Sequence, residues 1–293
     1  MIQRPLFTAP ESAFLVPFDG SFRTEDASTT PPAEDRHHPK KRLRAAERKL
    51  EDLQRLLLAN KTWALLLVFQ GMDASGKDST IRAVMSGISP TGCQVSNFKR
   101  PTRTELAHDF LWRTTRSLPE RGRIGIFNRS QYEEVLVVRV HPEILEGQRL
   151  PHATDSDEFW NERLQSIRDQ ERHLARNGVA ILKFWLNISK DEQKARFLSR
   201  LEESHKNWKF NPDDVAERQY WDRYMQAYEG ALTATSRPWA PWYAIPADKK
   251  PYLRAAIAEI IVRSLSSLDL RYPEPDAATL VGFAEAREKL EEE

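Results

Sequence analysis

The segment GMDASGKDST at residues 71–80 combines residue types and spacing suited to holding phosphate groups. It follows an apolar run at residues 63–69, which predicts a buried strand, and it should lead directly into a helix. Backbone N–H groups in such a loop, together with the positive end of the helix dipole, favour an anion. Lys77 adds a mobile cation. The segment therefore predicts a phosphate site, and a plain turn between a strand and a helix is the alternative.

This loop departs at one position from the phosphate-binding pattern G-x-x-x-x-G-K-[ST]. Gly71, Gly76 and Lys77 are in register, but Asp78 stands where a serine or threonine normally binds magnesium. Ser79 follows, so a hydroxyl is present but shifted along the chain. We expect the following loop residues to contact phosphate: Ala74, Ser75, Gly76, Lys77, Asp78 and Ser79.

A second polar segment, FNRSQYEE at residues 127–134, follows a predicted strand at 123–127. In P-loop enzymes the corresponding strand end commonly carries an acid that serves magnesium. Asn128 can coordinate or hydrogen-bond without bringing charge, Arg129 suits bidentate phosphate contacts, and Glu133 would restore negative charge near the metal. An ordinary strand-to-helix junction, with Asn128 as the helix cap and Arg129 in solvent, is the alternative.

A third segment, residues 196–218, is rich in cations. Arg196 and Arg200 are four residues apart and share one helix face, and Lys209 and Arg218 follow across a loop. Nucleoside monophosphate kinases carry a lid at this place, after the fourth strand, which brings positive charge to the phosphoryl group and excludes water. A solvated, charged connector is the alternative.

The near balance of charge argues against a nucleic-acid partner. The 293-residue chain carries 44 Lys and Arg against 43 Asp and Glu. Its longest apolar run is far shorter than the ~20 residues of a membrane span, and no secretory leader is recognisable. Cys93 is the single cysteine, which excludes an intrachain disulfide and a zinc cluster. We expect a cytoplasmic protein without a nucleic-acid or membrane partner.

Strands that alternate with helices predict βαβ units and a parallel sheet covered on both faces. The fold expected is therefore α/β, a P-loop kinase-like three-layer sandwich with a five-stranded parallel sheet and a helical lid. The strands are predicted at 63–69, 95–98, 123–127, 179–188 and 242–245. The helices are predicted at 40–59, 79–87, 104–118, 158–177, 190–201, 216–232, 251–268 and 276–293.

Composition divides the chain into three parts. Residues 1–40 are rich in proline and predict an N-terminal arm without helical period. Residues 41–275 form the expected phosphotransferase domain, with the lid at about 200–220. Residues 276–293 predict a C-terminal helical tail with an acidic tip.

With these segments in view, the chain resembles the family-2 polyphosphate kinases. The matching stretches are GMDASGKDST (71–80), FKRPT (98–102), HDFLWR (108–113), FNRSQYEEVLVVRVH (127–141), WKFNPDDVAERQYWDRYMQAYE (208–229) and APWYAIPADKK (240–250). The strand end Phe-Asn-Arg-Ser is similar to class III members, where other classes carry Phe-Asp-Arg-Ser. The resemblance implies transfer of the terminal phosphoryl group from inorganic polyphosphate to both AMP and ADP.

The resemblance also implies roles for individual residues. Asp73, Lys77, Asn128 and Arg129 are expected to be catalytic, and Arg129 and Glu133 to place the nucleotide. Polyphosphate is expected to contact the loop and these cations: Lys99, Arg196, Arg200, Lys209 and Arg218. Mg²⁺, with Mn²⁺ as a substitute, is the implied cofactor, bound by Asp73 and by Asn128 or Glu133. The implied partners are inorganic polyphosphate and adenine or guanine nucleotides, with a homodimer or homotetramer as the assembly.

Physical reasoning agrees with the resemblance, because a groove of lysine and arginine can hold a linear polyanion on a protein without net basic charge. The groove candidates are Lys99, Arg100, Arg103, Arg129, Arg139, Arg196 and Lys209. One alternative is an ATP-dependent nucleoside or thymidylate kinase on the same fold. Another is a non-catalytic nucleotide-binding module, which the intact Lys77 argues against.

Overall fold

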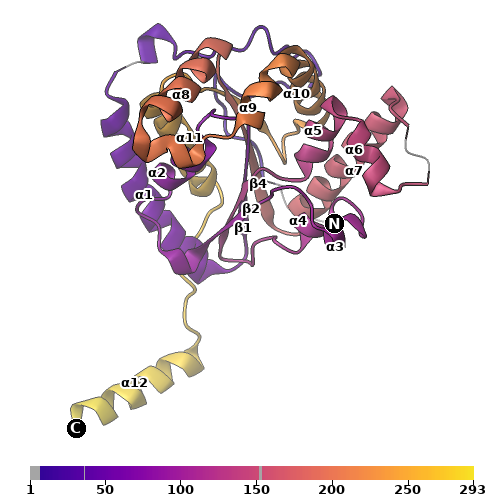
Figure 1. Ribbon diagram of the computed structural model, residues 1–293. Helices are drawn as coiled ribbons and strands as arrows, with labels where there is room; N and C mark the ends of the chain where they lie inside the picture. Colours follow the sequence, from indigo (N-terminus) through magenta and orange to yellow (C-terminus); the bar gives the residue numbers. More distant parts are fainter. Residues whose placement is uncertain (1–6, 36, 152–153) are drawn as a thin grey trace.

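A five-stranded parallel sheet forms the centre of the computed structural model, which describes residues 7–35, 37–151 and 154–293 (Figure 1). The strands are β1 (Ala64–Gln70), β2 (Cys93–Asn97), β3 (Ile124–Asn128), β4 (Val179–Asn187) and β5 (Trp242–Pro246). Their spatial order is β2-β3-β1-β4-β5, and every pairing is parallel. β1 is buried at every position, as expected of a central strand covered on both faces. The predicted α/β architecture is confirmed.

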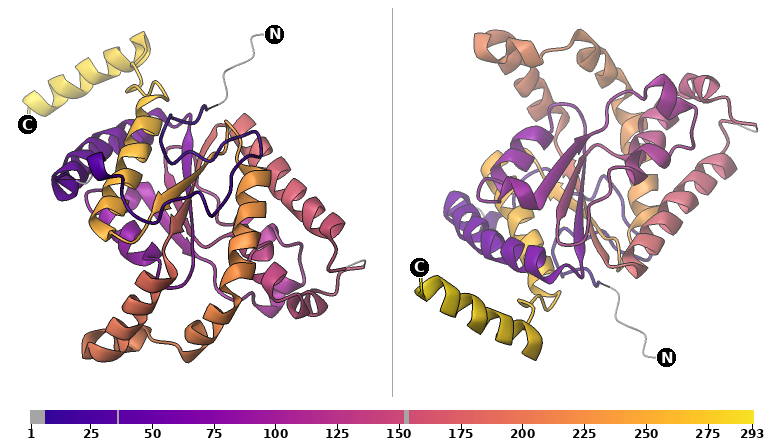
Figure 2. Two further views of the ribbon diagram at one scale, coloured as in Figure 1. Left: turned by 90° about the horizontal axis from the view of Figure 1, so that it is seen from above. Right: turned by 90° about the horizontal axis from the view of Figure 1, so that it is seen from below.

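Helices cover both faces of the sheet (Figure 2). One layer contains α1 (Pro39–Asn60), α2 (Lys77–Val84) and α11 (Lys250–Ser266). The opposite layer contains α7 (Asp157–Arg176) and α10 (Trp221–Thr235). The apolar stripe of α1 packs inward through Leu50, Leu53 and Leu57, which leaves its charged side chains outside.

Six further α-helices belong to the described body of the protein. They are α3 (Arg103–Leu106), α4 (Trp112–Thr115), α5 (Val137–Val140), α6 (Glu143–Gln148), α8 (Lys190–Glu202) and α9 (Pro212–Ala216). Short 3₁₀ helices are η1 (Ala33–Asp35), η2 (Pro90–Gly92), η3 (Gln131–Glu134), η4 (Ser204–Lys209) and η5 (Glu217–Tyr220). α8, η4 and α9 project from the body beside the sheet (Figure 2).

The prediction of one continuous helix over residues 104–118 is wrong. The chain forms α3 and α4 instead, separated by a turn. Asp109 explains the break, because its carboxylate accepts a hydrogen bond from the backbone N–H of Leu111 at 2.9 Å. Such a side-chain bond offers the backbone an alternative to the helical ladder.

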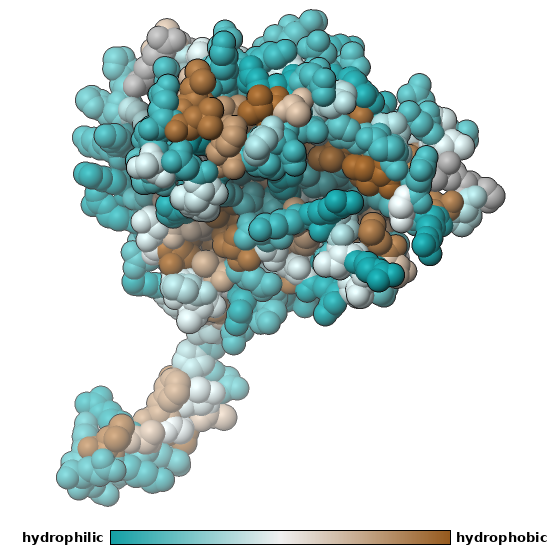
Figure 3. All heavy atoms as spheres, viewed as in Figure 1, coloured by the Kyte–Doolittle hydropathy of each residue, from teal (hydrophilic) through white to brown (hydrophobic). Residues whose placement is uncertain are grey.

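The two ends of the chain behave differently. The described part of the N-terminal arm lies along β5: the N–H of Val16 donates to Trp242 O and that of Ala244 to Phe14 O. The arm therefore covers the edge strand of the sheet. The C-terminal helix α12 (Ala277–Glu291) is exposed throughout and extends away from the body (Figures 1 and 3). None of the described helices has the length and apolar character needed to cross a membrane.

A buried polar network lies beneath the segment that follows β3. Lys183, fully buried on β4, donates to Glu171 Oε2 at 2.5 Å, to Tyr132 Oη at 2.9 Å and to Thr235 O at 2.9 Å. Tyr132 in turn donates to Glu171 Oε1 at 2.8 Å. Burial lowers the pKa of Lys183 to about 8 and raises the pKa of Glu171, while each charge favours the other. The network fixes η3, and with it the loop that carries Arg129.

We expect Lys183→Met to lower the free energy of unfolding by about 3–5 kcal/mol, because it leaves the carboxylate of Glu171 buried without its counter-ion. The double variant Lys183→Met/Glu171→Leu should recover most of this loss, since no charge then remains in the core. Urea denaturation of the single and double variants measures both values. A double variant that is less stable than Lys183→Met would contradict this account.

Candidate active site

The phosphate loop begins where β1 ends, and its shape depends on two glycines. A Cβ at Gly71 would lie 2.9 Å from Leu186 O and 2.9 Å from Ser75 Oγ. Gly76 has a φ of 105°, and Ala74, which is not a glycine, has a φ of 60°. These left-handed conformations turn the chain from the strand into α2 within a few residues. The tight loop that the sequence predicted is therefore present.

Lys77 lies within this loop. Its ammonium group donates to Gly71 O at 2.7 Å and to Met72 O at 3.2 Å, and the side chain is buried. Burial, followed by the charge of Arg129, lowers the pKa of Lys77. A bound anion beside the ammonium group would raise the pKa of Lys77 again, because its negative charge would offset both the burial and the repulsion from Arg129. The loop carbonyls provide such negative charge only in part.

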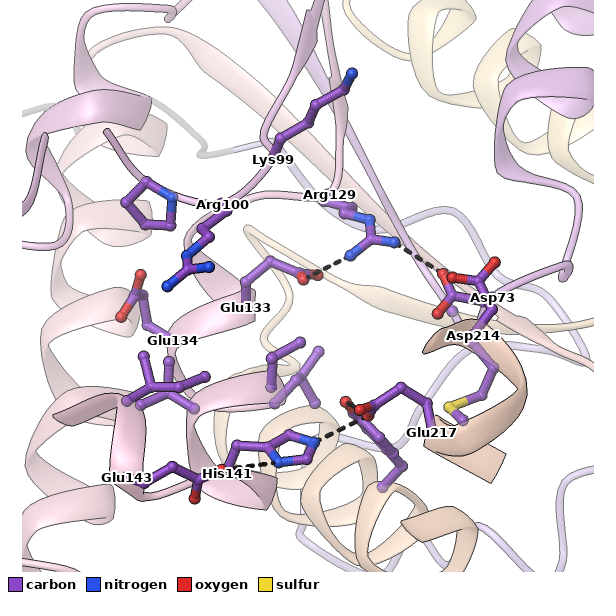
Figure 4. A pocket seen from close by; sticks show the side chains of 18 of the residues that line it. Asp73, Lys99, Arg100, Arg129, Glu133, Glu134, His141, Glu143, Asp214 and Glu217 are labelled. Atoms are coloured by element: carbon purple, nitrogen blue, oxygen red, sulfur yellow. Dashed lines mark hydrogen bonds and ion pairs between the residues drawn. The ribbon is translucent and has the colours of Figure 1, made fainter. Parts of the chain in front are cut away.

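Arg129 connects the loop to the end of β3. Phe69 and Asn128 are paired in the sheet, so the carboxyl ends of β1 and β3 lie side by side. Arg129 follows with a φ of 63° and donates to Asp73 Oδ1 at 2.8 Å and to Glu133 Oε2 at 3.2 Å (Figure 4). The carboxylate of Glu133, and then that of Asp73, raises the pKa of Arg129, which stays protonated. The two acids thus orient a permanent cation at this edge of the sheet.

Asn128 takes part in a polar cluster and does not cap a helix. Its amide nitrogen donates to Asp78 Oδ1 at 2.6 Å and to Asn97 Oδ1 at 2.8 Å. Its Oδ1 atom is buried and has no hydrogen-bond partner among the described residues. Ser130 caps η3 instead, since its hydroxyl accepts from Tyr132 N. The capping alternative is therefore not what the structure shows.

Arg196 lies directly behind the phosphate loop. Its guanidinium donates to Ala74 O at 2.9 Å and Ser75 O at 2.8 Å, and to Ala247 O at 2.6 Å. Because its donors already serve backbone carbonyls, Arg196 holds the loop against the segment after β5. A direct phosphate contact by Arg196 stays a prediction.

A cationic cavity of about 980 Å³ opens over the phosphate loop. Its cations outnumber its carboxylates, which are Asp73 and Asp78. The cations that line it are Lys77, Arg82, Lys99, Arg100, Arg129, Arg196, Arg200, Lys206, Lys209 and Lys250. Such a lining favours a ligand with many negative charges.

A mixed cavity of about 690 Å³ lies beside it (Figure 4). Its lining combines carboxylates with apolar and aromatic side chains: Met72, Leu106, Leu136, Val137, Val138, Ile144, Tyr224 and Tyr228. Four residues line both cavities, namely Asp73, Lys99, Arg100 and Arg129. We call these four residues the shared wall. A ligand in either cavity would meet the other ligand at this wall.

The expected lid residues differ in their placement. Arg200 and Lys209 line the cationic cavity, and Arg200 pairs with Asp214 at 3.4 Å. Arg218 lines neither cavity: it donates to Gln193 Oε1 at 2.6 Å, and Gln193 donates to Asp73 O at 2.9 Å. Arg218 therefore reaches the shared wall through Gln193.

The remaining predicted site residues are divided between the two cavities. Lys99 is part of the shared wall, Glu133 lines the mixed cavity, and Ala74, Gly76 and Ser79 line the cationic cavity. Two of the groove candidates, Arg103 and Arg139, line neither cavity.

Sequence reasoning missed one cluster in the mixed cavity. Glu217 Oε2 accepts from Tyr224 Oη at 2.8 Å and lies 2.9 Å from His141 Nε2 (Figure 4). The cluster joins the end of α5 to the start of α10. The one sequence signal was that His141 ends the long stretch 127–141, but no spacing rule linked it to residues near 220.

Comparison with known proteins gives a consistent result. The family model described as polyphosphate kinase 2 matches residues 33–273. A Rhodopseudomonas palustris protein named ADP-polyphosphate phosphotransferase is 53% identical over 88% of this chain and 89% of its own length. A Meiothermus ruber protein named AMP/ADP-polyphosphate phosphotransferase is 45% identical over 81% of this chain and 85% of its own length.

A solved structure agrees in fold along nearly the whole chain. The crystal structure of polyphosphate kinase 2 from Arthrobacter aurescens TC1 superposes with a TM-score of 0.86 at 35% sequence identity, covering 97% of this chain and 99% of that one. The sequence and the fold of this chain, which carries the phosphate loop, the β3 strand end and the two cavities, both match one group of proteins. The chain belongs to the polyphosphate kinase 2 family.

Proposed function

We propose that this protein transfers the terminal phosphoryl group between inorganic polyphosphate and adenine nucleotides, converting AMP to ADP and ADP to ATP. The observation that carries the proposal is the shared wall between a cationic and a mixed cavity. Donor and acceptor must meet in line at one phosphorus atom, and a common wall provides that meeting point. The names of the relatives, one with ADP and one with AMP and ADP, support the choice of acceptors.

Each cavity suits one substrate. A polyphosphate chain carries charge along its whole length and no apolar group, which fits the cationic cavity. A nucleotide has a base and a ribose at one end and phosphates at the other. The apolar and aromatic side chains of the mixed cavity suit the base, and Arg100 and Arg129 in the shared wall suit its phosphates.

The reaction needs little chemistry from the protein beyond placement and charge. A terminal phosphate oxygen of the nucleotide attacks the terminal phosphorus of polyphosphate, and the bond to the bridging oxygen breaks. The shortened chain leaves with that electron pair. Because the attacking oxygen is already deprotonated, no strong base is required. Lys77 and Arg129 stabilise the charge that spreads over the transferring group, and Asp73 keeps Arg129 in position.

We further propose that Mg²⁺ assists the reaction, with Mn²⁺ as a substitute. Mg²⁺ in such sites is usually held by one or two carboxylates together with substrate phosphates. Asp73 and Asp78 offer carboxylates in the cationic cavity, and the unpartnered Oδ1 of Asn128 offers an amide oxygen, so the donor set fits. Glu133 remains a further candidate ligand. Bound to the phosphates, the ion would neutralise charge in the transition state.

We also propose a moving part of the enzyme. The segment at about 200–220 is proposed to close as a lid, because Arg200 and Lys209 reach the cationic cavity from it. Several features of the protein stay predictions. They are the division into an arm (1–40), a domain (41–275) and a tail (276–293), the homodimer or homotetramer, the use of guanine nucleotides, the absence of a nucleic-acid partner and the cytoplasmic location.

An activity assay with purified protein tests the function directly. We expect ATP from ADP plus polyphosphate, ADP from AMP plus polyphosphate, and far slower turnover of AMP with ATP as the only donor. The ATP-dependent kinase alternative predicts the reverse donor preference. Turnover with ATP and none with polyphosphate would overturn the proposal.

We expect Lys77→Met to lower kcat by about 10²–10³-fold, because it removes one preorganised charge from the transition state. Methionine keeps the apolar stem that fills this buried position, so thermal unfolding should change little. Steady-state kinetics and the melting temperature together separate the two effects. Near-normal turnover in a folded Lys77→Met protein would count against the site.

For Arg129→Ala we expect a loss of about 2–4 kcal/mol in transition-state stabilisation, measured as kcat/KM. Asp73 and Glu133 would then face each other without the cation between them. Arg129→Lys is the matched control: it keeps one charge but cannot bridge both carboxylates, so it should restore only part of the activity. Full activity in Arg129→Lys would show that bridging is unnecessary.

A further inference from the structure

A second basic surface adjoins the cationic cavity across the start of α11. Lys250 lines the cationic cavity, and its neighbour Pro251 lines a separate open cavity of about 560 Å³. The other residues of that cavity come from the first turns of α1 and the residue before them, and include Lys40, Lys41 and Arg44. His38, Pro39 and Arg48 also line it, and among the described residues no carboxylate does. We call Lys40, Lys41, Arg44 and Arg48 the α1 basic face.

The cations of the α1 basic face are exposed and, among the described residues, form no ion pair. Other arginines on the same helix behave differently. Arg42 pairs with Asp35 and Glu259, and Arg55 pairs with Glu51. α1 thus neutralises some of its cations and leaves four together on one side. On a chain with a formal net charge of +1, this local excess of positive charge marks a surface for an anion.

A further cation, Arg254, lies near three cations that line the cationic cavity, namely Lys250, Arg82 and Arg196. Burial, and then the charges of Arg196 and Arg254, lowers the pKa of Lys250. Burial, and then Arg82 and Arg196, lowers the pKa of Arg254, whose Nε is buried without a hydrogen-bond partner among the described residues. These groups therefore lie close enough to repel one another. The carboxylate of Glu192, which pairs with Arg196, offsets the repulsion on Lys250 only in part.

We propose that the α1 basic face is a second binding site for inorganic polyphosphate, which holds the distal part of a long chain while its end occupies the cationic cavity. This inference rests on the proposed function. Lys250 and Pro251 are consecutive in the chain, so the two cavities lie next to each other at the start of α11. A linear chain of phosphates can extend from one cavity to the other, and its repeated charges would relieve the repulsion between neighbouring cations.

Two linked contacts change how chain length affects binding. Once the end of a chain is in the cationic cavity, its distal part is held at high local concentration near the α1 basic face. Long chains should therefore bind more tightly than short ones, although the reacting phosphate is the same. Nucleic acid and anionic membranes could also meet a basic surface, but the position of the α1 basic face next to the cationic cavity favours polyphosphate.

The test is a variant that replaces Lys40, Lys41, Arg44 and Arg48 by glutamine. Glutamine keeps helix propensity close to that of lysine and arginine, and the inward face of α1 is untouched. The matched control replaces four exposed cations elsewhere, Arg176, Arg271, Arg287 and Lys289, and so changes the net charge equally. KM for long polyphosphate and for a short oligophosphate is measured for both variants, together with direct binding of long polyphosphate at several salt concentrations.

For the α1 variant we expect KM for long polyphosphate to rise by at least about tenfold, which lies below the gain of about 10²–10⁴-fold that linking two sites can give. KM for the short oligophosphate and kcat should stay unchanged, and the control variant should resemble the wild type. Direct binding of long polyphosphate should weaken and become less salt-dependent, because fewer counterions are displaced.

Three results would overturn the inference. One is an unchanged KM for long chains, and another is an equal loss for long and short chains. The third is a variant that loses binding to duplex DNA or to phosphatidylserine vesicles but keeps its affinity for long polyphosphate. If the wild type makes no ATP from polyphosphate, the proposed function fails on its own, and the direct-binding measurement still decides whether the α1 basic face holds the chain.

Discussion

The position of Arg129 between two carboxylates is the interaction on which the rest of the site depends. The residue adopts a left-handed conformation that is costly for any side chain with a Cβ, so the surrounding structure must hold it there. Pairing of β1 with β3 brings Asp73 and Arg129 together, and the buried network around Lys183 fixes η3 and Glu133 from below. The result is a rigid cation at the wall between two cavities.

This arrangement explains how a protein with a formal net charge of +1 can hold a polyanion. Positive charge is concentrated where the carboxyl ends of the strands meet α2, α8 and α11, and acidic side chains balance it elsewhere. Within the cationic cavity the loop carbonyls hold Lys77 and Arg196 in place. Charge that is already oriented needs little reorganisation when a phosphoryl group moves, which is the main contribution a protein makes to this chemistry.

Sequence reasoning predicted the parts of the site that depend on local patterns and on sheet topology. The loop around Lys77 and the strand end at Asn128 and Arg129 were both identified, because parallel strands bring their carboxyl ends to one edge. It could not show that Arg196 supports the loop from behind or that His141 meets Glu217, since these contacts join segments far apart in the chain. The same limit applies to the mixed cavity, whose lining comes from the phosphate loop, the segments that follow β2 and β3, and the start of α10.

The most direct measurement is a crystal structure with a nucleotide and a short oligophosphate bound together. The account predicts the base in the mixed cavity, the oligophosphate in the cationic cavity, and their terminal phosphates facing each other beside Arg129 and Asp73. Both ligands in one cavity, or phosphates that meet away from Arg129, would contradict it.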